Sequence, residues 1–262
     1  MRSCSEKVLF LSWKKDNYIF ADAENLRRVL IEWFYKHGRD FPWRDKSALD
    51  PYKVLVTEIL LQKTKAETVG EMWHNFFKVF PTVKELAEST EDHVLEVIQC
   101  LGLAYRAKRL IKISRQIVEE FNSVVPSSFD KLLRLHGIGP YVASAVLCFA
   151  YGEPQPIVDV NVMRMMNRFK GFIDEKSIRE YISKVIPRDH PREFNWALLD
   201  VAATICKPDK PNCFACPLDS TCPKINAQMS KWRIMRKNVR GDVKLSLQPY
   251  SVRKKTRAKP KY

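Results

Sequence analysis

Apolar residues recur every three or four positions along most of this chain, which is the spacing of an amphipathic α-helix. The clearest stripe lies in residues 104–121 and consists of Ala107, Leu110, Ile111, Ser114, Ile117, Val118 and Phe121. Further helices are predicted over residues 23–37, 52–64, 67–80, 128–135, 141–151, 175–185 and 190–205, with another beginning near residue 159. Before residue 229 no segment alternates strictly between apolar and polar residues, so we expect an all-α fold.

Two helix starts are marked by residue type. Thr90, followed by Glu91 and Asp92, is typical of a helix N-terminus. Pro140 suits the first position of a helix, because the N–H that proline lacks would have no partner there. The helix that follows it is apolar nearly all round, so we expect it to be buried.

The overall composition is that of a soluble globular protein. Of the 262 residues, 45% are hydrophobic and 29% are charged. No run approaches the roughly 18 apolar residues of a membrane span, and no secretory signal is visible. We therefore expect no membrane partner and a cytoplasmic location, associated with the nucleoid if the source is a prokaryote.

Positive charge gathers at the C-terminal end. The net charge is +15, and residues 229–262 hold twelve Lys or Arg against one Asp, a net charge of +11. A basic tail of this kind suits a polyanion. A solvated end without a specific partner, or an anionic membrane surface, are the alternatives.

A Gly-x-Gly turn, Gly137 to Gly139, separates two predicted helices in the segment LHGIGPYVASAV. Two glycines permit a turn so tight that its backbone N–H groups point outward. Together with the start of the next helix these groups form an anion site, which a DNA phosphate would fit without any readout of base sequence. A plain turn between helices is the alternative.

Four of the seven cysteines crowd into seventeen residues with intervals of six, two and five: Cys206, Cys213, Cys216 and Cys222. Four thiolates at this spacing can wrap one compact metal centre. The odd total, with one tight cluster, indicates a metal site in a reducing cytosol and not a disulfide framework. Zinc remains an alternative to iron. Cys100 and Cys148 fit no metal pattern and are expected in the core.

Glu58 lies in a predicted helix that is otherwise mostly apolar. A carboxyl group on such a helix would be desolvated, which raises its pKa and keeps a proton available. An ordinary surface glutamate is the alternative.

Taken in order, these motifs resemble the helix-hairpin-helix DNA glycosylase superfamily, in its endonuclease III and adenine glycosylase branch. The hairpin is followed, eighteen residues after Tyr141, by Asp159 in the run PIVDVNVMRMMNRF, and then by the cysteine loop. The resemblance covers about residues 25–224. It implies that Asp159 is the catalytic carboxylate and that the four cysteines hold a [4Fe–4S] cluster. Asp159 would also be suited to capping a helix.

The resemblance also implies the architecture and the partner. A six-helix barrel containing the hairpin would span residues 51–165, and a discontinuous iron–sulfur domain would form from residues 23–50 and 166–224. Residues 1–22 would be an extension and residues 225–262 a basic tail. The partner would be double-stranded DNA with a mismatched or damaged base, bound by a monomer.

Further roles follow from the same resemblance. Tyr141 stands where bifunctional members carry the lysine that forms a Schiff base, so we expect a monofunctional enzyme that uses water. Glu58 matches the residue that protonates the base or activates water, and Gln62 the residue that fills the gap left by a flipped base. The other residues expected to contact DNA are Lys63, Tyr105, Gly137, Gly139 and Asn161. Two positions depart from the family: His136 replaces a usual proline and Pro140 a usual basic residue.

The expected target is thymine or uracil opposite guanine. The run TEILL at Thr57–Leu61, with Tyr141 and Asp159, resembles the mismatch-specific thymine/uracil group. An adenine glycosylase acting on A:8-oxoguanine or A:G pairs is the alternative, although the forty residues after Cys222 are too basic and polar for the additional domain of those enzymes. A non-enzymatic DNA-binding module and an abasic-site lyase using another lysine also remain open.

Overall fold

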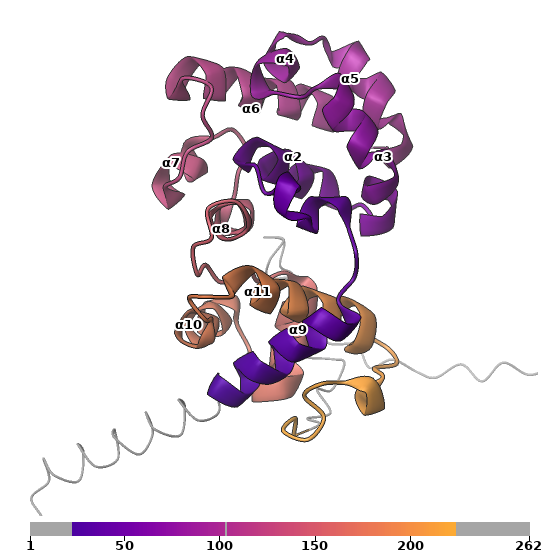
Figure 1. Cartoon of the computed structure of the whole chain (residues 1–262), viewed down its shortest axis with the longest axis vertical. Helices are drawn as coiled ribbons and strands as arrows, with labels where there is room; N and C mark the ends of the chain where they lie inside the picture. Colours follow the sequence, from indigo (N-terminus) through magenta and orange to yellow (C-terminus); the bar gives the residue numbers. More distant parts are fainter. Residues whose placement is uncertain (1–22, 103, 224–262) are drawn as a thin grey trace, which may run out of the picture. The chain divides into compact units, whose positions relative to one another are not determined.

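The computed structural model describes residues 23–102 and 104–223, and within these ranges the regular structure is entirely helical (Figure 1). The all-α prediction is confirmed. A helix over residues 23–37 precedes α2 (Pro51–Leu61), α3 (Ala66–Val79), α4 (Val83–Glu88), α5 (Glu91–Ile98), α6 (Tyr105–Phe121), α7 (Phe129–Arg134), α8 (Pro140–Phe149), α9 (Val160–Lys170), α10 (Glu175–Val185) and α11 (Pro191–Asp200). The described residues belong to one compact unit, Met1–Asn226; the expected extension and basic tail lie outside the described residues.

Most helices begin at a side chain that accepts a hydrogen bond from the first turn. The capping residues are Asp50, Thr82, Thr90, Ser128, Asp159 and Asp174. The start predicted at Thr90 is confirmed, and Pro140 occupies the first position of α8. These caps satisfy N–H groups that have no partner inside the helix, which fixes where each helix begins.

The centre of the core is formed by α2 and α8, which pack against each other. Residues 142–149 of α8 are all buried, as its uniformly apolar pattern predicts. On α6, which packs against α4 and α5, the predicted stripe is largely correct. Val118 and Phe121 are only partly buried, and Ile113 is buried although the stripe did not include it. Arg106 is also buried, a charged residue that is only 1% exposed.

A buried carboxylate joins the loop after the first helix to α11. Asp200, with no exposed side-chain surface, accepts hydrogen bonds from the backbone N–H and Nε of Arg39, each at 2.8 Å. Arg44 donates to the two Asp200 oxygens at 2.8 and 2.9 Å. The two guanidinium groups and the Arg39 N–H hold the pKa of Asp200 below its usual value despite its burial.

The helix predicted over residues 190–205 is not uniform. After α11, residues Val201–Ile205 form a π-helical turn that leads directly to Cys206. The Ala202 carbonyl in this turn accepts a hydrogen bond from Arg164 at 2.6 Å. The 3.6-residue pattern does not distinguish a π turn from a continuing α-helix, because both extend the same helical segment.

Cys148 is buried as expected, but the prediction for Cys100 is wrong: it is exposed, in the 3-10 turn Gln99–Leu101 after α5. No helix in the described ranges combines the length and the apolar character needed to cross a bilayer.

Candidate active site

Three helices bring the three predicted catalytic residues into electrostatic contact. Glu58 lies in the interior of α2, Tyr141 in the first turn of α8, and Asp159 at the N-cap of α9. The charges of Glu58 and Asp159 both raise the pKa of Tyr141, and Asp159 also raises that of Glu58. Residues 101 positions apart in the sequence therefore form one cluster.

Glu58 is a buried carboxyl group. It is 5% exposed, and its Oε2 has no hydrogen-bond partner among the described residues. Burial raises the pKa of Glu58 to about 7, against the opposing effects of Arg44 and of the Tyr141 hydroxyl. The interpretation as a surface glutamate is wrong, because the apolar face of α2 packs into the core on both sides of this residue.

Tyr141 remains a neutral phenol over the ordinary pH range. Burial raises its pKa well above the usual value, and the two nearby carboxylates raise it further. The positive charge of Arg179 opposes them. A neutral hydroxyl facing two carboxyl groups acts as a hydrogen-bond donor.

Asp159 is held by its own helix. Its Oδ1 accepts hydrogen bonds from the backbone N–H groups of Asn161 and Val162 at 2.8 and 2.7 Å, and its Oδ2 accepts one from the Asn161 side chain at 2.9 Å. The N-terminus of α9 also favours a negative charge at this place. The carboxylate is partly exposed, so it is oriented and yet accessible.

Asn161, expected to contact DNA, has its side-chain amide bonded within the protein. Its nitrogen donates to Asp159, and its oxygen accepts from Arg164 at 2.9 Å. Arg164 in turn donates to the Cys206 carbonyl at 2.8 Å. A chain of hydrogen bonds thus connects Asp159 to the cysteine loop. Sequence reasoning missed Arg164, although its spacing of three residues from Asn161, on the same helix face, was a possible signal.

The predicted hairpin forms between α7 and α8. Gly137 has φ +70°, which favours glycine, whereas Gly139 has φ −100°. Within the described residues no acceptor is bonded to the backbone N–H of either glycine. A Cβ atom added at Gly139 would meet nothing within 4 Å, so this edge of the hairpin faces open space.

The remaining predicted DNA contacts lie at the end of α2 and the start of α6. Gln62 ends α2 and is partly buried, and Lys63 is exposed with φ +60°. Tyr105 begins α6 and is 51% exposed. Arg109, which the sequence analysis missed, bonds both Gln62 and Gly137 and so connects this edge to the hairpin.

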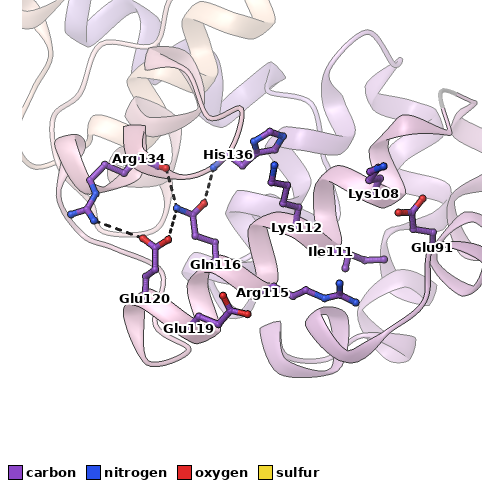
Figure 2. A pocket seen from close by; sticks show the side chains of 10 residues that line it. All are labelled: Glu91, Lys108, Ile111, Lys112, Arg115, Gln116, Glu119, Glu120, Arg134 and His136. Carbon is purple, nitrogen blue, oxygen red and sulfur yellow. Dashed lines mark hydrogen bonds and ion pairs between the residues drawn. The ribbon is translucent and has the colours of Figure 1, made fainter.

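A groove of about 580 Å³ lies beside the hairpin (Figure 2). Lys108, Lys112 and Arg115 of α6 line it, and the His136 ring lies beside Lys112. Gln116 accepts a hydrogen bond from the His136 N–H at 2.9 Å and donates to the Arg134 carbonyl at 3.1 Å. The groove contains none of the three catalytic candidates. The two Gln116 hydrogen bonds anchor the start of the hairpin to α6.

The four clustered cysteines share one neighbourhood near α9. Arg168 donates to the Cys206 sulfur at 3.5 Å, and its carbonyl lies 3.8 Å from the Cys222 sulfur. Burial and the charges of the other three thiols raise the pKa of Cys216 to about 11. None of the four is in a disulfide, and in the described part of the chain no three acidic, cysteine or histidine side chains are arranged to hold an ion as they stand. Four thiolates at these positions would repel one another, and a cationic metal centre would offset that repulsion.

Comparisons with known proteins give a family match and several relatives. The family described as "HhH-GPD superfamily base excision DNA repair protein" matches residues 56–188. The chain is similar to a thymine-DNA glycosylase of Aeropyrum pernix (38% identity, covering 76% of this chain and 93% of the relative). An adenine DNA glycosylase of Buchnera aphidicola is 33% identical, and the match spans 63% of its length. The structure of a thermostable thymine-DNA glycosylase superimposes with a TM-score of 0.73 at 30% identity, covering 77% of this chain and 95% of that one.

Replacing Glu58 with Gln is expected to stabilise the protein increasingly as the pH rises. The folded protein binds the Glu58 proton more tightly than the unfolded chain does, because the pKa of Glu58 is about 7 when folded and near 4.5 when unfolded. The wild-type protein therefore loses stability as the pH rises from about 4.5 through about 7. Full ionisation costs roughly 3 kcal/mol. Denaturant unfolding between about pH 5 and pH 8.5 measures this difference. The exposed Glu96→Gln serves as the control, and a Glu58→Gln curve parallel to wild type would contradict the assignment.

The two hairpin glycines should respond differently to alanine. Gly137→Ala places a side chain at positive φ and 3.1 Å from Arg109 Nε, so we expect a loss of about 1–2 kcal/mol in unfolding free energy. Gly139→Ala meets no clash, and its stability should change by less than about 0.5 kcal/mol. Its affinity for duplex DNA should nevertheless fall about tenfold, if a phosphate approaches the N–H groups there. Unchanged affinity would show that the phosphate does not bind at this edge.

Proposed function

Because the chain belongs to the HhH-GPD superfamily of base excision DNA repair proteins, we propose that it is a monofunctional DNA glycosylase that removes thymine or uracil paired with guanine. The observation that carries the proposal is the cluster of Asp159, Glu58 and Tyr141 beside a glycine hairpin with unbonded N–H groups. The reaction is hydrolysis of the N-glycosidic bond of a nucleotide that has rotated out of the duplex.

Asp159 stabilises the sugar as the bond breaks. Positive charge develops on the deoxyribose ring, and a carboxylate close to that ring lowers the energy of the transition state, as in glycoside hydrolysis. Its hydrogen bonds to Asn161 and Val162 keep it in place before the nucleotide arrives. A preorganised charge does not have to reorient during the reaction.

Glu58 and Tyr141 act on the base and on water. A carboxyl group with a pKa of about 7 is present in both protonation states near neutral pH, so Glu58 can donate a proton to the departing base or accept one from water. Tyr141 donates a hydrogen bond to these carboxylates. A phenol cannot form a Schiff base, so water is the final nucleophile and strong lyase activity is not expected.

The DNA is held at the hairpin and at the end of α2. The N–H groups of Gly137 and Gly139 bind a phosphate, and the exposed Lys63 binds another. Gln62 enters the duplex at the gap left by the flipped nucleotide, and the exposed Tyr105 lies against the neighbouring bases. Asn161 acts through Asp159.

The four clustered cysteines hold a [4Fe–4S] cluster in this proposal. When bound, the cluster cross-links the loop from Cys206 to Cys222 and takes no part in bond breaking. The iron–sulfur domain would consist of residues 23–50 and 166–224, and the six-helix barrel of residues 51–165. The chain would act as a monomer on double-stranded DNA.

Thymine or uracil is the proposed base because the matches to thymine and thymine/uracil glycosylases extend over 90–96% of those relatives. Adenine opposite 8-oxoguanine is the second candidate. The buried Glu58, whose pKa is about 7, supports it, since a purine departs more easily when it is protonated.

Duplexes containing G:T, G:U or A:8-oxoguanine, treated with alkali after incubation, should be cut at T or U by the wild-type protein. Asp159→Asn retains the cap but loses the charge, so single-turnover excision should fall at least about a hundredfold while DNA binding persists. Asp174→Asn is the matched control, because Asp174 caps α10 in the same way. Excision of adenine alone would select the second candidate, and near-normal turnover by Asp159→Asn would remove Asp159 from catalysis. Covalent trapping by borohydride would reveal a lyase.

Protein purified without oxygen should contain about four iron atoms and four acid-labile sulfides per chain. Cys216→Ser should lose most of the iron, whereas Cys100→Ser should retain it because Cys100 is exposed and outside the loop. Elemental analysis distinguishes the metals: one zinc per chain and no labile sulfide would replace the iron–sulfur proposal with a zinc site.

A further inference from the structure

Two arginines at the start of α6 reach across to the end of α2. Arg106 Nη2 donates to the backbone carbonyl of Gln62. Arg109 Nη1 donates to the side-chain oxygen of the same glutamine at 2.7 Å. Both the backbone and the side chain of Gln62 are therefore held by α6.

The same Arg109 guanidinium also holds the hairpin. Its Nη2 donates to the Gly137 carbonyl at 2.5 Å, and its Nε lies 3.1 Å from the place that a Gly137 Cβ would occupy. One planar group thus bridges Gln62 and the hairpin, which are 75 residues apart in the sequence. A guanidinium presents its donors in a fixed fork, so the two acceptors are held at a set distance and angle.

This bridge is maintained without an acidic partner. Within the described residues, neither Arg106 nor Arg109 forms an ion pair with a carboxylate. Burial lowers the pKa of both against the opposing effect of the nearby Tyr105. By hydrogen-bond geometry, three of their buried nitrogens have no partner in the described part of the chain: Nε of Arg109, and Nε and Nη1 of Arg106. Incompletely paired cations are costly for stability alone, so a role in function is the better explanation for this arrangement.

We propose that Arg109 is a positioning residue that holds the Gln62 side chain in a fixed place relative to the hairpin. Insertion of Gln62 into the duplex is thereby coupled to phosphate binding at the hairpin. The inference rests on the proposed function. A free glutamine side chain must lose rotamer entropy on entering the base stack. Because Arg109 already orders it in the free protein, less of that entropy is lost on binding and the flipped state of the nucleotide is more populated.

The test is a double-mutant cycle read by nucleotide flipping and by excision. The variants are Gln62→Ala, Arg109→Met and their combination, with 2-aminopurine beside a G:T pair to report flipping and single-turnover rates to report excision. We expect each single variant to reduce flipping and excision about tenfold, and the double variant to be no slower than Gln62→Ala. Lys108→Met is the control, since it removes one positive charge from the same turn of α6 and bonds neither Gln62 nor the hairpin.

The salt dependence of DNA affinity provides a second readout. Arg109 is bonded to carbonyl oxygens, so Arg109→Met should leave the slope of log affinity against log salt unchanged, whereas Lys63→Met should reduce it by about one. Arg109→Lys retains the charge but not the fork, so it should behave like Arg109→Met. A slope reduced by about one in Arg109→Met, or full function in Arg109→Lys, would make Arg109 a phosphate contact and overturn the proposal.

The outcomes separate this inference from the function. A wild-type protein that excises no base from any duplex would refute the proposed function. A wild-type protein that excises normally, with additive losses in the double variant or no loss in Gln62→Ala, would refute only the role of Arg109. Thermal unfolding of each variant identifies any loss that reflects misfolding, and a folded Arg109→Lys that fails in flipping supports the inference on its own.

Discussion

The bidentate pairing of Arg44 with Asp200 is the interaction on which the rest of the described structure depends. It fixes the loop after the first helix against α11, and Trp196 of α11 stacks between Phe34 and Phe149 at ring distances of 5.7 and 5.2 Å. A buried ion pair is weakly stabilising in itself, but removal of one partner leaves an uncompensated charge and is strongly destabilising. The loop that contains Arg39 and Arg44 is therefore held in one fixed position against α11.

The same arginine sets the electrostatics of the site. Burial has the largest effect on the pKa of Glu58 and raises it. Among the groups that lower this pKa, the charge of Arg44 has the largest effect. Arg44 is also paired with Asp200, and at Glu58 its charge only partly offsets the effect of desolvation. The pKa of Glu58 consequently lies at about 7. Asp159, at the N-terminus of α9, accepts its hydrogen bonds from backbone and side-chain amide N–H groups.

Much of the fold was predictable because its signals are local. Apolar spacing located the helices, and Thr90 and Pro140 marked two of their starts. Glu58 was predictable as a desolvated acid because most of its neighbours on α2, such as Leu55, Ile59 and Leu61, are apolar. Arg106 and Arg109 were not, since an arginine on an amphipathic helix is usually solvated, and only the position of Gln62 in space gives them partners. The partners of Asn161, Asp159 and Arg164, both lie on α9, but only the fold shows that Arg164 also bonds the Cys206 carbonyl of the cysteine loop.

The π-helical turn Val201–Ile205 has a geometric consequence for the cysteine loop. A wider turn contains one more residue than an α-helical turn, so a chain lacking one residue here would continue as a regular helix. If all five residues were instead wound as a regular α-helix, Cys206 would rotate by roughly a quarter turn around the axis from its place beside Arg168, and the Ala202 carbonyl would return to the helix and release Arg164. The winding of this turn therefore sets the direction of the Cys206 sulfur. Through Arg164 and Asn161 it also affects the hydrogen bonds that hold Asp159.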